Sequence, residues 1–134
     1  MKRIILLAFL CTTTLVMAQR INHVQEAIAN YDYEAALTLI AKEKPTIPLL
    51  LQKGKAQRGL GMNTEALSTY QEIITNDTAN TRAYIEAAEC CRSLAKYQQA
   101  LKYYEQALDL NPENKYVRIQ YIGLLLSLRS FRML

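Results

Sequence analysis

The residues of this chain that could perform chemistry are few and do not form groups. There is one histidine, His23, and there are three cysteines, so a catalytic pair or a metal site would have to be built around these. His23 has only ordinary acidic residues near it in sequence, and a lone histidine of this kind is more often a solvated or packed side chain than a catalyst. No spacing of His, Cys, Asp or Glu resembles a set of metal ligands. The sequence therefore predicts no catalytic residue, no metal and no cofactor.

The adjacent Cys90 and Cys91 do not indicate a disulfide framework. Neighbouring side chains on a helix point about 100° apart and cannot bridge without distorting the backbone. We expect Cys91 to pack as a small apolar residue and Cys90 to lie near the surface. The glycines at 54, 59 and 61 form no phosphate loop, because no Lys-Ser/Thr pair follows them.

Residues 1–18 have the pattern of a secretory signal peptide. Lys2 and Arg3 precede an apolar run that extends to Val16, and Val16-Met17-Ala18 offers small residues at the positions before cleavage. An uncleaved membrane anchor is the alternative, but the run of roughly 15 residues is shorter than the ~20 that a spanning helix needs. A lipoprotein signal acylated at Cys11 is disfavoured by the bulky Leu10. We expect cleavage after Ala18 and a secreted or periplasmic chain.

The charge of the chain gives no sign of a nucleic-acid partner. The 134 residues carry 16 Lys and Arg against 12 Asp and Glu, and without Lys2 and Arg3 the balance is 14 to 12. Basic and acidic residues are interspersed, whereas nucleic-acid binding requires a basic stripe or patch. The size suits one domain, residues 19–134, and the scarcity of Gly and Pro favours ordered helices.

Apolar residues at helical spacing continue through the rest of the chain, and no strand pattern interrupts them. Asp32 is a candidate N-cap for a helix through about Lys44, and Asn63 is a candidate N-cap for the helix that follows Gly61. The predicted helices are 20–29, 32–44, 48–60, 63–76, 81–94, 97–110 and 115–128. Because the connections are short, neighbouring helices should pack as antiparallel hairpins.

The sequence repeats itself with a period of 34 residues, which is typical of a stack of similar helical units. The matching residues are Ala66, Tyr70 and Ile73 in one copy and Ala100, Tyr104 and Ala107 in the next. Such stacks present surfaces to partners more often than they build catalytic sites.

This period resembles that of the tetratricopeptide repeat family. The best copy is 81–114, where the family pattern is matched by Tyr84, Tyr97, Ala100, Tyr104, Ala107 and Pro112. The other predicted copies are 19–46, 47–80 and a partial one at 115–134. The resemblance implies an all-α right-handed solenoid of about three repeats plus a C-terminal helix. Close helix packing would involve Gly54, Ala66, Ala87, Ala88 and Ala100, and the spaces between hairpins would be filled by Tyr70, Tyr84 and Tyr104.

The resemblance also implies a concave groove, lined by the first helix of each repeat, that receives a peptide or a partner helix. Carried over by position, the groove residues are Leu51, Gln52, Lys55, Arg58, Arg82, Ile85, Glu86, Glu89, Arg92, Ile119 and Gln120. The pairs Arg82–Glu86 and Glu89–Arg92 could instead be ordinary ion pairs on a helix surface. One subtype of the family binds the C-terminal carboxylates of chaperones, an activity that Glu86 disfavours here because it would repel the carboxylate.

The last predicted helix is apolar on nearly all sides, which requires cover all round. We expect either that the natural protein continues beyond Leu134 or that residues 116–128 dock to a partner or to a second copy in a homodimer. The function predicted is a non-catalytic protein-interaction scaffold of the cell envelope or periplasm that binds a peptide or partner subunit. The alternative is a structural module that assembles through its C-terminal helix.

Overall fold

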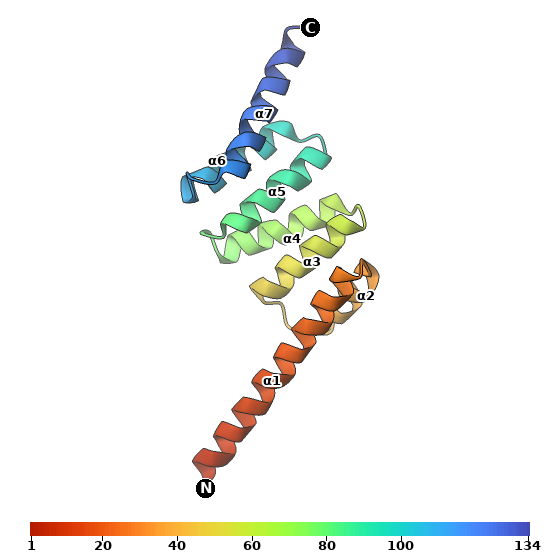
Figure 1. Cartoon of the computed structure of the whole chain (residues 1–134), viewed down its shortest axis with the longest axis vertical. Helices are drawn as coiled ribbons and strands as arrows, with labels where there is room; N and C mark the ends of the chain where they lie inside the picture. The colour runs from red at the N-terminus through yellow and green to blue at the C-terminus, as the bar shows by residue number, and fades with distance from the viewer. The chain divides into compact units, whose positions relative to one another are not determined.

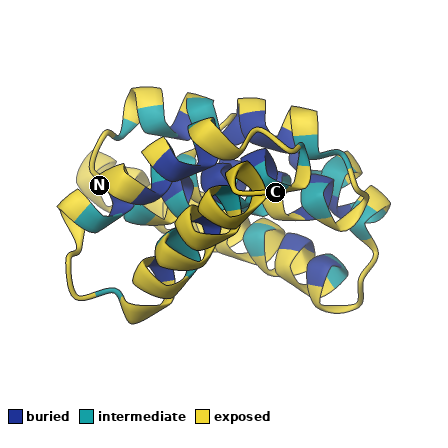
Figure 2. Ribbon diagram, turned by 90° about the horizontal axis from the view of Figure 1, so that it is seen from above, coloured by how far each residue is buried: buried dark blue, intermediate teal, exposed yellow.

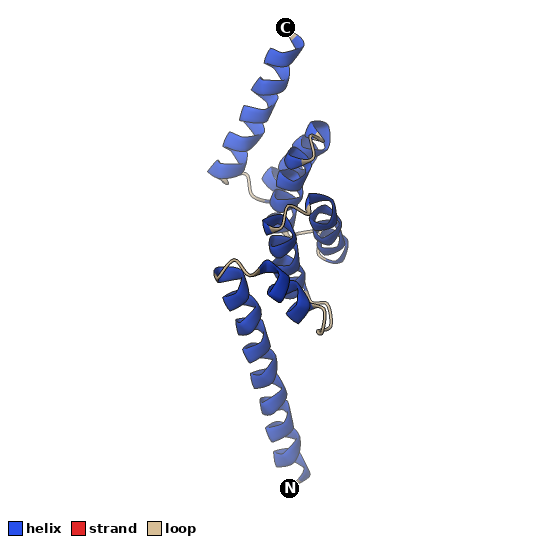
Figure 3. Cartoon of the chain, turned by 90° about the vertical axis from the view of Figure 1, so that its right-hand side faces the viewer, coloured by secondary structure: helices blue, strands red, loops and turns tan.

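Every element of secondary structure in the computed structural model, which describes residues 1–134, is an α-helix (Figures 1 and 3). The helices are α1 (Lys2–Ala29), α2 (Tyr33–Ile40), α3 (Ile47–Gly59), α4 (Asn63–Asn76), α5 (Thr81–Ser93), α6 (Tyr97–Leu110) and α7 (Lys115–Arg132). The all-helical prediction is confirmed. The chain divides into two compact units, Met1–Leu60 and Gly61–Leu134, and each is described by itself.

The first unit packs α1, α2 and α3 around a small apolar core. The buried members of this core are Val24, Ile28, Ala36, Ile40, Leu49 and Ala56. Asp32 caps α2 as predicted, since its carboxylate accepts a hydrogen bond from the Ala35 amide at 3.1 Å. The side chain of Thr46 caps α3 in the same way, with Pro48 in the first turn.

Helix α2 ends at Ile40, so the prediction that it continues to about Lys44 is wrong. The amides of Lys42 and Glu43 bond to the carbonyls three residues earlier, which tightens the chain into turns. Pro45 then disfavours a helical conformation at the residue before it.

The first half of α1 contributes nothing to the core. Residues 1–20 are all exposed, and Val24 is the first buried side chain of the chain. Removal of residues 1–18 therefore leaves every buried side chain in place. By length and composition α1 could cross a membrane, but a signal sequence near an N-terminus passes the same test.

At the end of α3, the ring of Tyr33 packs directly against the backbone of Gly59. A Cβ atom at this position would lie 2.4 Å from the Tyr33 ring. No side chain fits there without displacing Tyr33, so the close approach of α2 to the end of α3 requires glycine.

In the second unit, α4 packs against α5, α5 against α6 and α6 against α7. Helix α5 thus packs against both α4 and α6, and nearly half of its residues are buried. Those residues are Ala83, Tyr84, Ala87, Ala88, Cys90 and Cys91. Figure 2 shows buried and exposed positions side by side along the helices. The expectation that Cys90 lies near the surface is wrong, since both cysteines are 0% exposed.

The small and aromatic residues of the 34-residue pattern occupy packing positions, as predicted. The alanines at 66, 87, 88 and 100 are fully buried, and Gly54 is buried in the first unit. Tyr70 and Tyr104 are among the largest fully buried side chains, and Tyr84 is 7% exposed. Small residues let helices approach closely, and tyrosine rings fill the remaining space.

Asparagine side chains start two helices of the second unit. Asn80 accepts a hydrogen bond from the Ala83 amide, and Asn114 accepts one from the Val117 amide, each at 3.1 Å. The prediction of an N-cap at Asn63 is wrong, because Asn63 is the first helical residue and no side chain caps α4.

The turns that precede α4 and α6 use the same backbone conformation. Gly61 has a φ of 75° and Ala95, 34 residues later, has a φ of 57°. The Lys96 amide donates to the Cys91 carbonyl, which is the bond that closes a helix end of this kind. The period is therefore present in the backbone as well as in the packed side chains.

Helix α7 is longer and more exposed than α5. It continues to Arg132, past the predicted end near Leu128, and its end extends beyond α5 and α6 (Figures 1 and 3). Only Val117 and Leu124 are buried along it. Tyr121 and Leu128 are partly buried, and the other apolar side chains of the helix are exposed.

Candidate partner-binding cleft

The eleven predicted groove residues lie on α3, α5 and α7. The four on α3 belong to the first unit, where Leu51, Gln52 and Arg58 are partly buried and Lys55 is exposed. On α5, Arg82 is exposed, while Ile85, Glu86, Glu89 and Arg92 are partly buried. On α7, Ile119 is 67% exposed and Gln120 is partly buried.

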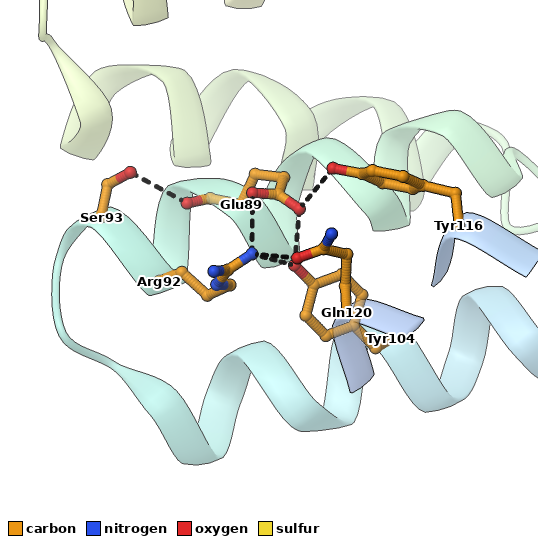
Figure 4. Close-up of polar contacts among 6 residues, drawn as sticks. All are labelled: Glu89, Arg92, Ser93, Tyr104, Tyr116 and Gln120. Atoms are coloured by element: carbon orange, nitrogen blue, oxygen red, sulfur yellow. Dashed lines mark hydrogen bonds and ion pairs between the residues drawn. The ribbon is translucent and has the colours of Figure 1, made fainter. Parts of the chain in front are cut away.

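Three of these residues meet in one polar cluster within the second unit (Figure 4). Arg92 Nη1 donates to Gln120 Oε1 at 2.6 Å, which joins α5 to α7. The same nitrogen lies 3.4 Å from Glu89 Oε2, so the predicted Glu89–Arg92 ion pair is present. Its role is larger than that of a surface pair, because it is part of a link between two helices.

Two tyrosines complete the cluster by donating to Glu89. The Tyr104 hydroxyl of α6 lies 2.6 Å from Glu89 Oε1, and the Tyr116 hydroxyl of α7 lies 3.1 Å from the same atom. Arg92 also lies within hydrogen-bond distance of the Tyr104 oxygen, at 3.4 Å. The carboxylate of Glu89 is thereby oriented from three directions (Figure 4).

The pKa values of the cluster follow from this arrangement. Burial, and then the hydrogen bond to Glu89, raises the pKa of Tyr104 far above its ordinary value. Burial also raises the pKa of Tyr116, with the negative charge of Glu89 as the next cause. The hydrogen bond with Tyr104 is the main cause that raises the pKa of Arg92. At neutral pH the tyrosines are therefore neutral donors and Arg92 is a cation.

A cleft of about 850 Å³ opens beside this cluster. Glu89, Arg92 and Ser93 of α5 form its polar side. The rest of the lining is mainly apolar and comes from Tyr97 at the start of α6 and from Leu124, Ser127, Leu128 and Phe131 of α7. Charged and aliphatic groups in one cleft suit a peptide-like chain, which presents both kinds of surface.

The α7 residues of the cleft were absent from the predicted groove. Leu124, Ser127, Leu128 and Phe131 follow one another at steps of three, one and three residues, which places them on one face of a helix. This signal was present in the sequence. It was missed because the resemblance assigned only Ile119 and Gln120 of this helix to the groove, and because the helix was predicted to end near Leu128, before Phe131.

Comparison with known proteins supports the 34-residue pattern. Residues 81–114 match the model of the tetratricopeptide repeat family. The sequence of this segment is therefore similar to a tetratricopeptide repeat. The segment contains α5 and α6, and therefore the helix pair that holds Glu89, Arg92 and Tyr104.

Human tetratricopeptide repeat protein 6 is 30% identical to this chain over 89 residues. The match covers 66% of the chain but only 16% of the human protein, so the chain corresponds to a small part of that relative.

Two solved structures show the same fold. One is the first tetratricopeptide domain of Spaghetti (RPAP3) bound to the HSP90 peptide SRMEEVD, with a TM-score of 0.78 and 20% identity; the match covers 84% of this chain and 92% of that one. The other is the Yersinia enterocolitica type III secretion chaperone SycD with a peptide of the translocator YopD, with a TM-score of 0.73 and 16% identity; it covers 88% and 93%. The chain therefore has the fold of tetratricopeptide-repeat domains.

Proposed function

We propose that this chain is a non-catalytic protein-interaction scaffold that binds a peptide or a segment of a partner subunit. The observation that carries the proposal is the cleft in the second unit, where the oriented Glu89–Arg92 pair lies beside an apolar wall from α7. Hydrogen bonds fix the polar groups of this cleft before any ligand arrives, which lowers the entropic cost of binding. The structures with the same fold were solved with peptides bound, and this supports the same mode of use here.

The cleft should bind its partner in part through Phe131. This side chain lines the cleft and is 78% exposed, so its truncation removes a contact surface and little of the folded core. Ile119 on the same helix is 67% exposed and does not line the cleft, which makes Ile119→Ala a matched control.

The test is affinity capture from envelope extract with residues 19–134 as bait, followed by mass spectrometry and by titration of the captured peptide. The proposal expects a partner whose affinity falls about tenfold with Phe131→Ala and is unchanged with Ile119→Ala. A partner that binds both variants and the parent equally would place recognition outside the cleft and contradict the proposal.

The proposed location is the periplasm or the cell exterior, after cleavage between Ala18 and Gln19. The exposure of residues 1–20 supports this, since the core does not depend on them. The intact mass of the protein in a periplasmic fraction tests the proposal. A mass that includes residues 1–18, with the protein in the membrane fraction, would instead support an uncleaved anchor.

A second candidate function is assembly through α7. It is favoured by four large aliphatic side chains of this helix that are at least 40% exposed, namely Ile119, Ile122, Leu125 and Leu126. A row of this kind on one helix is typical of a docking surface. Light scattering of residues 19–134 and of Leu125→Glu tests whether the occupant of this surface is a second copy.

A further inference from the structure

A second groove lies on the other side of α7, between this helix and α6. It has a volume of about 510 Å³. Leu101 of α6 lines the groove and is 8% exposed. The α7 residues that line it include Ile122, Leu125 and Leu126, which are 40–60% exposed. The groove shares Leu128 with the cleft but none of the polar cluster.

The 34-residue period shows what this surface lacks. Ala88 and Cys91 of α5 are fully buried, and the residues one period later are Ile122 and Leu125, which are 47% and 40% exposed. Helix α5 packs closely against both α4 and α6, whereas α7 packs closely against α6 and meets α5 through the polar cluster. The equivalent positions of α7 are therefore apolar like those of α5, but no helix of Gly61–Leu134 covers them.

The charge of the groove indicates the chemistry of that neighbour. The only charged side chains that line it are Arg129 and Arg132, and both are exposed. Helix α7 carries no Asp or Glu at any position. At the α6 edge of the groove, Gln98 lies in a first turn that has no acidic residue and no side-chain cap. The polar rim of the groove is therefore positive. In the cleft, by contrast, the positive charge of Arg92 is paired with Glu89.

We propose that this groove binds an amphipathic helix of a partner protein whose apolar face is flanked by acidic residues. Its aliphatic side chains would cover Ile122, Leu125 and Leu126, and its carboxylates would pair with Arg129 and Arg132. This inference rests on the second candidate function and specifies the partner. Residues 122–132 span about 15 Å of helix, which is room for about three turns of a partner helix.

Two other occupants fit the groove less well. A second copy packed through its own α7 would bring a helix without a single carboxylate against the two arginines. An anionic membrane surface would satisfy the arginines, but it could not reach Leu101, which lines the groove and is only 8% exposed.

The experiment uses two synthetic helical peptides of about four turns, each with leucines on one face. One has glutamates beside the leucines, and the other has lysines at the same positions. Fluorescence anisotropy measures their binding to residues 19–134, to the double variant R129E/R132E, and to Leu125→Glu. The arginines and Leu125 are exposed or half exposed, so circular dichroism should show unchanged folding of all variants.

We expect the acidic peptide to bind at least about tenfold more tightly than the basic one, and R129E/R132E to reverse this preference. Leu125→Glu should abolish the binding of both peptides. Tighter binding of the basic peptide would contradict an acidic partner. So would equal affinity for the two peptides, with binding of both lost in Leu125→Glu. Either result would still be consistent with docking through α7.

The remaining outcomes overturn the proposal in separate ways. A dimer that Leu125→Glu dissociates would identify a second copy as the occupant. Binding to anionic vesicles that depends on Arg129 and Arg132, without binding of the acidic peptide, would identify a membrane. A monomer that binds neither peptide nor vesicles would end both this inference and the second candidate function.

Discussion

Helices α5 and α7 begin 34 residues apart and hold equivalent places in successive repeats, yet their surroundings differ. Each is capped by an asparagine, and Ala83 and Cys90 of α5 are buried like their counterparts Val117 and Leu124 of α7. The similarity ends there, because α5 packs closely against both α4 and α6, whereas α7 packs closely against α6 and meets α5 through the polar cluster. The repeat thus determines how a helix starts and which face meets the preceding hairpin. Whether the opposite face is buried depends on the neighbour.

The largest difference in stability between variants of the α5 region and variants of α7 should come from removing an aromatic ring that packs beside α5. Tyr104→Ala deletes a fully buried aromatic side chain that also donates to Glu89, and we expect a loss of about 3–5 kcal/mol in the free energy of unfolding. Leu126→Ala on α7 removes a side chain that is 60% exposed and should cost less than about 0.5 kcal/mol. Urea denaturation of residues 19–134 measures both. Similar losses for the two variants would mean that α7 is covered in solution.

A larger side chain on α5 should also cost more stability than a substitution at the equivalent position of α7. Ala87 is 0% exposed, so Ala87→Leu inserts three carbon atoms into a packed interface and should destabilise the fold by about 1–3 kcal/mol. The residue one period later is Tyr121, which is only partly buried and already larger than leucine, so Tyr121→Leu removes volume and should change stability little. Thermal melts followed by circular dichroism report the difference. Tolerance of leucine at position 87 would show that α5 is less tightly packed than the structure indicates.

The hydroxyl of Tyr104 should affect stability in a pH-dependent way. Tyr104→Phe keeps the ring but removes a donor to a carboxylate, which should cost about 1–2 kcal/mol at neutral pH. The folded protein raises the pKa of Tyr104, so the stability that this hydroxyl adds is complete below the ordinary tyrosine pKa of about 10 and is lost as pH rises above it.

Denaturation curves at neutral and alkaline pH check this expectation. The gap between parent and Tyr104→Phe should narrow above about pH 10. Tyr121→Phe is a comparison of smaller effect: the hydrogen bond to the exposed Glu105 also raises the pKa of Tyr121, but at the surface, so both its gap and the change with pH should be smaller. A gap that widens with pH would contradict the assignment of Tyr104 as the neutral donor to Glu89.

The smallest expected effect is a gain in stability, at Gly123 of α7. Gly123 lies inside α7, and a Cβ atom there would have no other atom within 4 Å. Gly123→Ala should therefore stabilise residues 19–134 by about 0.5–1 kcal/mol through the lower entropy of the unfolded chain. The midpoint of thermal unfolding is the measurement. A loss of stability that grows with protein concentration would reveal that a second copy packs against this position.

The helices and the packing positions could be predicted because they depend on local patterns. Alanine and tyrosine at a fixed period determined the bounds of 97–110, and Asp32 marked the start of α2. The burial of Cys90 was mispredicted because it requires helices on two sides of α5, which no local pattern records. The polar cluster was missed for the same reason. Its hydrogen bonds join residues 12 to 28 positions apart, and Tyr104 could be recognised as a packing residue but not as a donor to Glu89.

The two buried cysteines of α5 can be used to measure how often the packing around this helix opens. In residues 19–134 the only thiols are those of Cys90 and Cys91, both without exposed surface, and burial raises the pKa of Cys91 so that little thiolate forms. A thiol reagent can therefore react only when the packing around α5 opens. The rate of labelling under native conditions would measure how often the repeat opens, in the way that amide exchange does but at a single known helix.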